Sequence, residues 1–312
     1  MERRDFLKTS LALAALAVAD PLVSVAAEEK AEEKAKVFAA KCVKGAVGTP
    51  GAIKDALTRL LAPMGGIQRF VKKGSRVLVK PNFSFSMPPE AGTSTSPELV
   101  RTLAVMCREA GAAIVVVCDN TIKNSKVCLE RTGIEAALKD LEGVRIAVPQ
   151  RPAEFRDVDV PKGKALKKVK LANDLFDSDV YINLPTAKSH SSTVVSFGLK
   201  NQMGLILDRG SFHSRFDIHQ GIADLATVAR PHLTLLDATR CLETGGPGGP
   251  GRVVETGMLI GSLDAVALDT FGTTLAGWGG KPITPADVKH LGDASAHGLG
   301  VSDLAKIEVV RV

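Results

Sequence analysis

The sequence predicts an α/β fold, namely an open, mostly parallel, doubly wound sheet with helices on both faces. First, short aliphatic runs alternate with longer amphipathic segments along the 312 residues. Second, 45% of the residues are hydrophobic but only 4% are aromatic, which predicts an aliphatic core of the kind found between a parallel sheet and its helices. Third, several of the aliphatic runs end in polar residues, as central parallel strands do where they meet their loops.

The first 27 residues precede this fold and resemble a twin-arginine export signal. Arg3 and Arg4 are followed by an apolar run over 11–19 and by a small-residue cleavage site at Val25 and Ala27. The run is shorter than the roughly 20 residues of a membrane-spanning helix, and an ordinary buried helix is the other alternative. We therefore predict a signal peptide over 1–27, a linker over 28–35 and a single domain over 36–312. The expected location is the periplasm or another site reached by this export route.

The first half of the domain contains four predicted strands and three predicted helices. In the third of these strands, six apolar or thiol residues precede Asp119 and Asn120. Ser96 is placed to cap the helix that Pro97 begins, and Gly111 ends that helix. The lysine-rich segment 150–172 is expected to form a small hairpin or a solvated excursion, in either case outside the main sheet. The predicted strands are 36–42, 76–83, 113–118 and 144–148, and the predicted helices are 51–64, 97–110 and 133–141.

The second half repeats the alternation and closes with an edge strand. A glycine-rich loop over 242–252 interrupts it. The predicted strands are 179–185, 232–240, 257–261 and 305–312, and the predicted helices are 216–230, 264–277 and 284–298.

Polar side chains follow four of the predicted strands. Because the carboxyl ends of parallel strands meet at one edge of a sheet, these side chains are expected to gather in one crevice. The four sets are Lys80 with Asn82, Asp119 with Asn120, Asn183 with Lys188 and His190, and Asp237 with Thr239 and Arg240.

The order of several motifs resembles the DUF362 family, a family named for its unassigned activity. The motifs are KPN, GTSTSP, NLPTAKSH, GLKNQMGLI, LLDATRCLETGGPGGPGR and GSLDAVALD, with His219 ahead of GIADLA. The resemblance implies a site, from which we assign five candidate catalytic residues: Lys188, His190, Lys200, Asn201 and His219. The candidate ligand-binding residues are Lys80, Asn82, Thr95, Asp119, Asn183, Asp237, Asp264 and Asp269.

Some of these residues have simpler interpretations. Asp264 lies at a predicted helix start and could act only as a cap. Asp269 lies about 140° around that helix, so the two carboxylates are not expected to form a dyad. The glycine-rich loop could hold an anion with its N–H groups or be a mobile surface loop.

The sequence predicts no metal site and names no cofactor. The histidines His190, His213 and His219, with Asp217, match no closed metal motif. Many DUF362 members carry a cluster-binding segment with closely spaced cysteines. The five cysteines of this chain show no such spacing and are interpreted as buried thiols.

Two lysines near one buried crevice require either carboxylate partners or an anionic ligand. We therefore expect an anion-binding cleft, in an exported enzyme acting on a small anionic substrate or cofactor. The alternative is a non-catalytic periplasmic carrier or maturation factor for a ligand or metal. The net charge of +6 does not indicate nucleic acid, because export and the scarcity of aromatic residues both argue against it. The expected partners are the small anion and, during export, the twin-arginine translocase, with no membrane span after cleavage.

Overall fold

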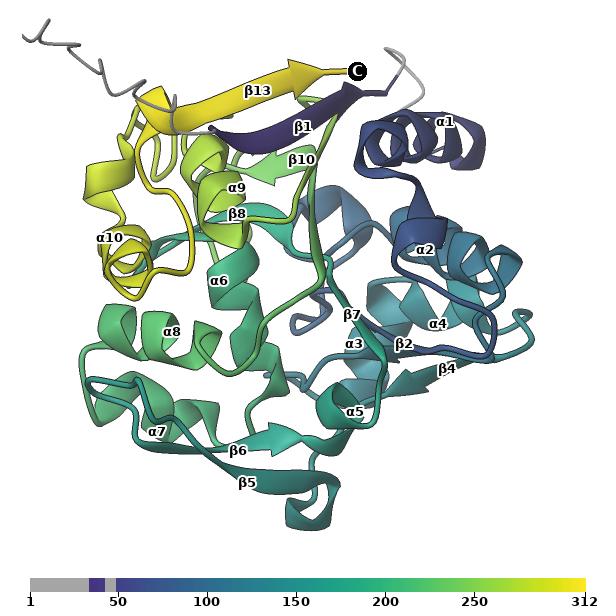
Figure 1. The fold of residues 1–312 in the computed structure, drawn as a ribbon, viewed down its shortest axis with the longest axis horizontal. Coiled ribbons are helices and arrows are strands. Elements are labelled where there is room, and N and C mark those ends of the chain that lie inside the picture. Colours follow the sequence, from purple (N-terminus) through teal and green to yellow (C-terminus); the bar gives the residue numbers. More distant parts are fainter. Residues whose placement is uncertain (1–33, 43–48) are drawn as a thin grey trace, which may run out of the picture. The chain divides into compact units, whose positions relative to one another are not determined.

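A computed structural model describes residues 34–42 and 49–312 and is drawn as a ribbon in Figure 1. The predicted signal peptide lies outside the described residues, as does most of the predicted linker. Strand β1 begins at Ala35, the last residue of that linker. Among the described helices, none is long and apolar enough to cross a membrane.

The main sheet confirms the predicted α/β class. Its hydrogen-bonded neighbours follow the order β13-β1-β12-β10-β7-β2-β3-β4. Strands β4, β3, β2, β7 and β10 are parallel, whereas β12 is antiparallel to both β10 and β1. The strands are β1 (Ala35–Lys41), β2 (Arg76–Lys80), β3 (Ile114–Cys118), β4 (Val144–Ala147), β7 (Val180–Asn183), β10 (Leu233–Leu242), β12 (Met258–Ser262) and β13 (Ile307–Arg311).

Helices cover both faces of the sheet, because its strands bury aliphatic side chains on both sides. In β2, Val77 and Val79 point to one face of the sheet and belong to the hydrophobic core formed with α1, α2 and α4. Leu78 points to the other face and belongs to the hydrophobic core formed with α6 to α10. The helices are α1 (Pro50–Leu61), α2 (Pro97–Glu109), α3 (Ser125–Arg131), α4 (Ile134–Leu138), α5 (Asn173–Phe176), α6 (Gly198–Asn201), α7 (Arg209–Ser214), α8 (Ile218–Ala226), α9 (Ala265–Gly272) and α10 (Lys289–Ala296). The short 3-10 helices are η1 (Ala62–Met64), η2 (Ile67–Arg69), η3 (Pro89–Ala91), η4 (Pro152–Glu154), η5 (Gln202–Leu205), η6 (Pro285–Asp287) and η7 (Leu304–Lys306).

The lysine-rich segment forms a hairpin, the first of its two predicted alternatives, and lies outside the main sheet as expected. Strands β5 (Phe155–Asp159) and β6 (Lys168–Ala172) pair only with each other in a separate two-stranded sheet. In Figure 1 this hairpin lies at the bottom of the molecule, away from β1 and β13. The five cysteines are all buried and unpaired, as predicted.

A second hairpin is absent from the sequence-based prediction. Strands β8 (Thr186–His190) and β9 (Val194–Ser196) are antiparallel, and β8 also pairs with β10. Val194, the first residue of β9, has a φ of 65°, a left-handed conformation that is uncommon for a β-branched residue. The two-residue strand β11 (Val253–Val254) extends the same region by pairing with β10.

The start of α2 differs from the expectation in one respect. Ser96 occupies the position before the helix, but its side chain makes no capping hydrogen bond. Instead, Asp237 Oδ2 accepts the backbone N–H of Ser96 at 2.7 Å. A carboxylate from β10 therefore holds the beginning of α2.

Candidate functional site

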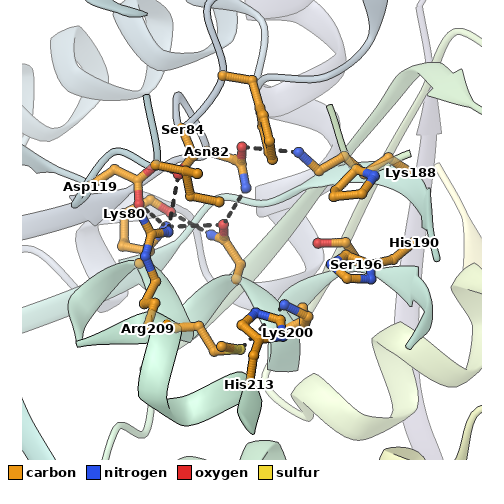
Figure 2. A pocket seen from close by; sticks show the side chains of 17 residues that line it. Lys80, Asn82, Ser84, Asp119, Lys188, His190, Ser196, Lys200, Arg209 and His213 are labelled. Atoms are coloured by element: carbon orange, nitrogen blue, oxygen red, sulfur yellow. Dashed lines mark hydrogen bonds and ion pairs between the residues drawn. The ribbon is translucent and has the colours of Figure 1, made fainter. Parts of the chain in front are cut away.

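A cavity of about 280 Å³ lies beyond the carboxyl ends of β2 and β3 (Figure 2). Its remaining walls come from the β8–β9 hairpin, α6, η5 and α7. We call it the cationic cavity, because four of its lining residues are lysine or arginine and one is a carboxylate. The lining residues are Lys80, Asn82, Ser84, Phe85, Asp119, Ile122, Lys188, His190, Ser196, Lys200, Asn201, Met203, Gly204, Arg209, Gly210, His213 and Pro247.

A buried ion pair forms one wall. Lys80 Nζ donates to Asp119 Oδ1 at 2.8 Å, and both side chains are fully buried. Asp119 Oδ2 accepts hydrogen bonds from the backbone N–H of Phe83 at 2.9 Å and from Ser84 Oγ at 2.8 Å. Burial lowers the pKa of Lys80, and the Asp119 carboxylate opposes that shift. Among the described residues that line the cavity, Asp119 is the one carboxylate, and it is therefore already bonded to protein groups.

Asn201 links this pair to the neighbouring strands. Its Oδ1 accepts from Lys80 Nζ at 3.0 Å and from Asn82 Nδ2 at 3.2 Å. Its Nδ2 donates to Asn183 Oδ1 at 2.8 Å and to the Lys80 carbonyl at 3.0 Å. Asn201 thus fixes the orientation of the wall, and all its hydrogen-bonding groups are used within the protein.

Lys188 enters from the opposite side, on the β8–β9 hairpin. Its Nζ donates to Asn82 Oδ1 at 3.2 Å and to the carbonyl of Thr93, and it lies 4.5 Å from the ring centroid of Phe85. These neighbours favour an ammonium without neutralising it. Burial, reinforced by the nearby cations, lowers the pKa of Lys188.

Lys200, on α6, differs from the other two lysines. Its Nζ bonds only to Met203 Sδ, at 3.3 Å, and no carboxylate of the described residues lies within ion-pair distance. The residue is 8% exposed. Burial, together with Arg209 and Lys80, lowers the pKa of Lys200 to about 7.

Arg209 completes the positive side of the cavity. It begins α7 and donates to the carbonyl of Asn120 and to Ser84 Oγ, the latter at 3.3 Å. Both acceptors are neutral. Three of the four cations in the cavity therefore lack a carboxylate partner among the described residues.

Two imidazoles flank these cations. The rings of His190 and His213 are stacked with centroids 6.2 Å apart. Burial and nearby Lys200 lower the pKa of His190 to about 3 and that of His213 to about 4. His190 Nδ1 accepts the backbone N–H of Ser192 at 3.0 Å, so the neutral ring carries its proton on Nε2. His190 is therefore a donor at neutral pH, whereas Lys200 titrates near neutral pH.

Six of the predicted site residues do not line the cavity, namely Thr95, Asn183, His219, Asp237, Asp264 and Asp269. Thr95 Oγ1 accepts from Asn82 N at 2.9 Å and donates to the Leu184 carbonyl at 2.8 Å. Asn183 Nδ2 donates to the Gly198 carbonyl at 2.8 Å. Both residues lie behind the wall and hold it in place. The same description applies to Asn120, whose Nδ2 donates to the carbonyl of Ile206.

The three predicted aspartates outside the cavity hold backbone N–H groups instead of a ligand. Asp237 accepts from Ser96 N, as described above, and from Thr239. Asp264 caps α9 by accepting from Ala267 N at 2.8 Å, the simpler of its two interpretations. Asp269 accepts from Gly198 N and Leu199 N, both at 2.8 Å, and burial raises its pKa to about 7. It fixes the start of the helix that carries Lys200 and Asn201.

His219 is also outside the cavity. Its Nδ1 lies 3.2 Å from Nδ1 of His290. Arg240 pairs with Glu255 at 3.3 Å, so the fourth predicted set of strand-end residues does not join the other three. In the part of the chain that the structure describes, no group of three or more His, Cys, Asp or Glu side chains is placed to hold a metal ion.

Several cavity residues were not among the sequence-based candidates. Ser84, Phe85 and Ile122 come from loops after β2 and β3, and Ser196 comes from β9. Gly204 is required by close packing, because a Cβ there would lie 1.9 Å from Asp119 Oδ1 and 2.5 Å from Lys80 Nζ. The glycine-rich loop contributes Pro247 to the lining, and its Gly246 N–H donates to Ser189 Oγ at 3.2 Å.

Comparison with known proteins assigns this chain to a protein family. Residues 77–274 match the family described as Domain of unknown function (DUF362). The chain belongs to the DUF362 family.

One relative and two solved structures show how far the similarity extends. The chain is 30% identical over 229 residues to the thylakoid-associated protein sll1697 of Synechocystis sp., covering 70% of this chain and 68% of that protein. A Thermotoga maritima protein aligns with a TM-score of 0.37 and 14% identity, over 60% of this chain and 50% of that one. The lactate racemase apoprotein of Thermoanaerobacterium thermosaccharolyticum aligns with a TM-score of 0.48 and 12% identity, over 77% and 57%. The chain thus spans about half the length of the first solved protein and 57% of the second.

Proposed function

We propose that the cationic cavity binds a small organic anion and that the protein is an enzyme acting on it. The observation that carries the proposal is the charge imbalance: Lys188, Lys200 and Arg209 line one cavity, and none has a carboxylate partner among the described residues. A buried cation without a counter-charge is costly, and an anionic ligand would supply that charge.

The cavity also holds a group suited to proton transfer. General acid–base catalysis works best when the pKa of the group lies near the working pH. The pKa of Lys200 is lowered to about 7, which satisfies this condition, whereas His190 remains a neutral donor. We assign Lys200 as the acid–base candidate, and Lys188 and Arg209 as the groups that stabilise negative charge.

A titration of purified protein with malonate, propionate and inorganic phosphate tests the binding step. We expect at least one of them to bind, and Lys200→Met to weaken its affinity by about tenfold or more, which corresponds to about 1.4 kcal/mol. The control is Lys54→Met, because Lys54 is 59% exposed and lies outside the cavity. Absence of binding, or equal binding by the Lys200 variant, contradicts the proposal.

The non-catalytic carrier is separated from the enzyme by following the bound anion over time. NMR spectra of an anion that binds should change with wild-type protein and stay constant with Lys200→Met. An anion that binds and is recovered unchanged would favour the carrier.

We propose further that the protein is exported by the twin-arginine route and cleaved before Glu28. The support is the Arg3–Arg4 motif with its short apolar run, and the description of a relative as a thylakoid-associated protein. These N-terminal residues lie outside the described part of the chain.

A further inference from the structure

We propose that Lys200 is a nucleophile that condenses with the carbonyl carbon of a small 2-oxo acid held in the cationic cavity. The inference rests on the proposed anion-binding function and deepens it by naming the chemical class of the substrate.

The first argument is that the three cavity lysines are bonded differently. Lys80 Nζ has three oxygen acceptors, on Asp119, Asn201 and Pro81, at 2.7 to 3.0 Å. Lys188 Nζ has two oxygen acceptors and the Phe85 ring. Lys200 Nζ has only the weak acceptor Met203 Sδ. Lys200 is therefore the cavity lysine whose nitrogen lone pair can be freed by losing a proton without breaking a bond to oxygen.

The second argument is the environment of that nitrogen. A lysine becomes a nucleophile when burial or a neighbouring cation favours its neutral form. Lys200 meets both conditions, because it is 8% exposed and interacts repulsively with Arg209 and Lys80. A substantial fraction of the amine is neutral at physiological pH as a result.

The third argument concerns what the rest of the cavity can hold. Lys188 and Arg209 line the same space as Lys200, and Figure 2 shows their side chains on different sides of it. The Lys188 ammonium and the Arg209 guanidinium are groups that can hold the carboxylate of a ligand. Phe85, Ile122 and Met203 add apolar lining that fits a short hydrocarbon group. A volume of about 280 Å³ limits the ligand to a small molecule. A 2-oxo acid combines these requirements, since its carboxylate is one bond away from its ketone.

The reaction balances without an oxidant or reductant. The neutral Lys200 amine forms a bond from Nζ to the carbonyl carbon. The bond between that carbon and the carbonyl oxygen then breaks, and the oxygen leaves as water with the two amine hydrogens. The product is an imine, which takes up one proton to become an iminium ion paired with the carboxylate of the substrate. His190 Nε2–H, as a neutral donor in the same cavity, is placed to hydrogen-bond the leaving oxygen.

Chemical trapping tests the proposal. Wild-type protein is incubated with pyruvate or 2-oxobutyrate and sodium cyanoborohydride, and its intact mass is measured. We expect one adduct per chain, with the mass of the oxo acid less one oxygen atom, and peptide mapping should place it on Lys200. Excess malonate, which has no ketone, should suppress the adduct by occupying the cavity. Lys200→Arg keeps the charge but has no comparable nucleophile, so it should bind malonate and give no adduct.

The outcomes separate the two proposals. If malonate binds in the cavity but no adduct forms, or adducts spread over exposed lysines such as Lys54, the imine step is wrong and the anion site stands. If none of malonate, propionate, inorganic phosphate and the oxo acids binds, both proposals fall. Mapping the adduct on wild-type protein keeps the test decisive even where a Lys200 variant fails to fold.

Discussion

Lys200 is a residue that reduces the stability of the folded protein. Folding moves its ammonium from water into a cavity with other cations and no carboxylate partner among the described residues. A group of this kind lowers the free energy of unfolding, and its retention is typical of a functional site.

The stability cost gives the first prediction, for Lys200→Met. The folded pKa of Lys200 is about 7, against 10.5 for an ordinary lysine. Below about pH 7 the lysine is charged in both states. Between pH values of about 7 and 10.5, the unfolded chain binds more protons than the folded chain. The free energy of unfolding of the wild-type protein therefore rises with pH in that window. The variant should therefore exceed wild type by on the order of 5 kcal/mol at about pH 6, and the difference should shrink toward about pH 10.

Urea denaturation at several pH values measures this difference. A Lys200→Met variant that is less stable than wild type at low pH, or a difference that does not vary with pH, contradicts the assigned pKa.

The Lys80–Asp119 pair gives the second prediction at this scale. Asp119→Asn leaves Lys80 buried without its counter-charge, which should reduce the free energy of unfolding by on the order of 3 kcal/mol. The matched control is Asp140→Asn. Asp140 pairs with Arg101 at 2.6 Å, but its side chain is 58% exposed and the pair is screened by solvent, so the change should have a much smaller effect on stability. Equal effects of the two substitutions in thermal or urea denaturation would count against a structural role for the buried pair.

At the scale of elements, the β8–β9 hairpin and the α6–η5 segment bring the polar groups together. The parallel strands β2, β3, β7 and β10 could be predicted because their aliphatic runs are long enough to define a strand. The hairpin could not, because β8 has the sequence TAKSH and faces a polar cavity, which removes the aliphatic pattern. The family motifs marked Asp264 and Asp269 together with Lys200. The residue type alone does not reveal whether a carboxylate meets a ligand or a helix N-terminus.

The prediction at the scale of elements concerns the replacement of Gly204, in η5, by alanine. Gly204→Ala would place a Cβ against both Asp119 and Lys80, so we expect a loss of at least about 2 kcal/mol of stability together with weaker anion binding. Gly292→Ala in α10 is the matched control. A Cβ at Gly292 meets nothing within 4 Å, and the change should stabilise the helix by roughly 0.5–1 kcal/mol. Anion titration and urea denaturation of both variants measure these effects. A Gly204→Ala variant with the stability and anion affinity of wild type would contradict the prediction, because Asp119 and Lys80 could then move to make room for the Cβ.

At the scale of the molecule, the sheet topology explains why residues distant in sequence share one cavity. Strands β2 and β3 are adjacent and parallel, so their ends deliver Lys80 and Asp119 to the same edge. The sequence-based convergence prediction includes β10, but Asp237 faces the start of α2 and Arg240 faces Glu255. The fourth set is therefore displaced from the cavity, because β10 continues past that edge to Leu242 and pairs there with β8 and β11.

Export is the prediction that concerns the whole chain. Replacing both Arg3 and Arg4 by lysine should retain the full-length precursor in the cytoplasm, since the twin-arginine pair is the recognised feature of the signal. Cell fractionation followed by N-terminal sequencing measures the outcome, with Glu28 expected as the first residue of the exported wild-type protein. Unchanged export of the double variant would refute the assigned route.

The central claim is that an anion supplies the negative charge missing from the cationic cavity. Its most direct test is the number of protons taken up when malonate binds at about pH 8, measured by calorimetry in buffers of different ionisation enthalpy. An anion beside Lys200 should raise its pKa, so we predict uptake of up to about one proton by wild-type protein and much less by Lys200→Met. Malonate binding without proton uptake, or equal uptake by the two proteins, would contradict the account.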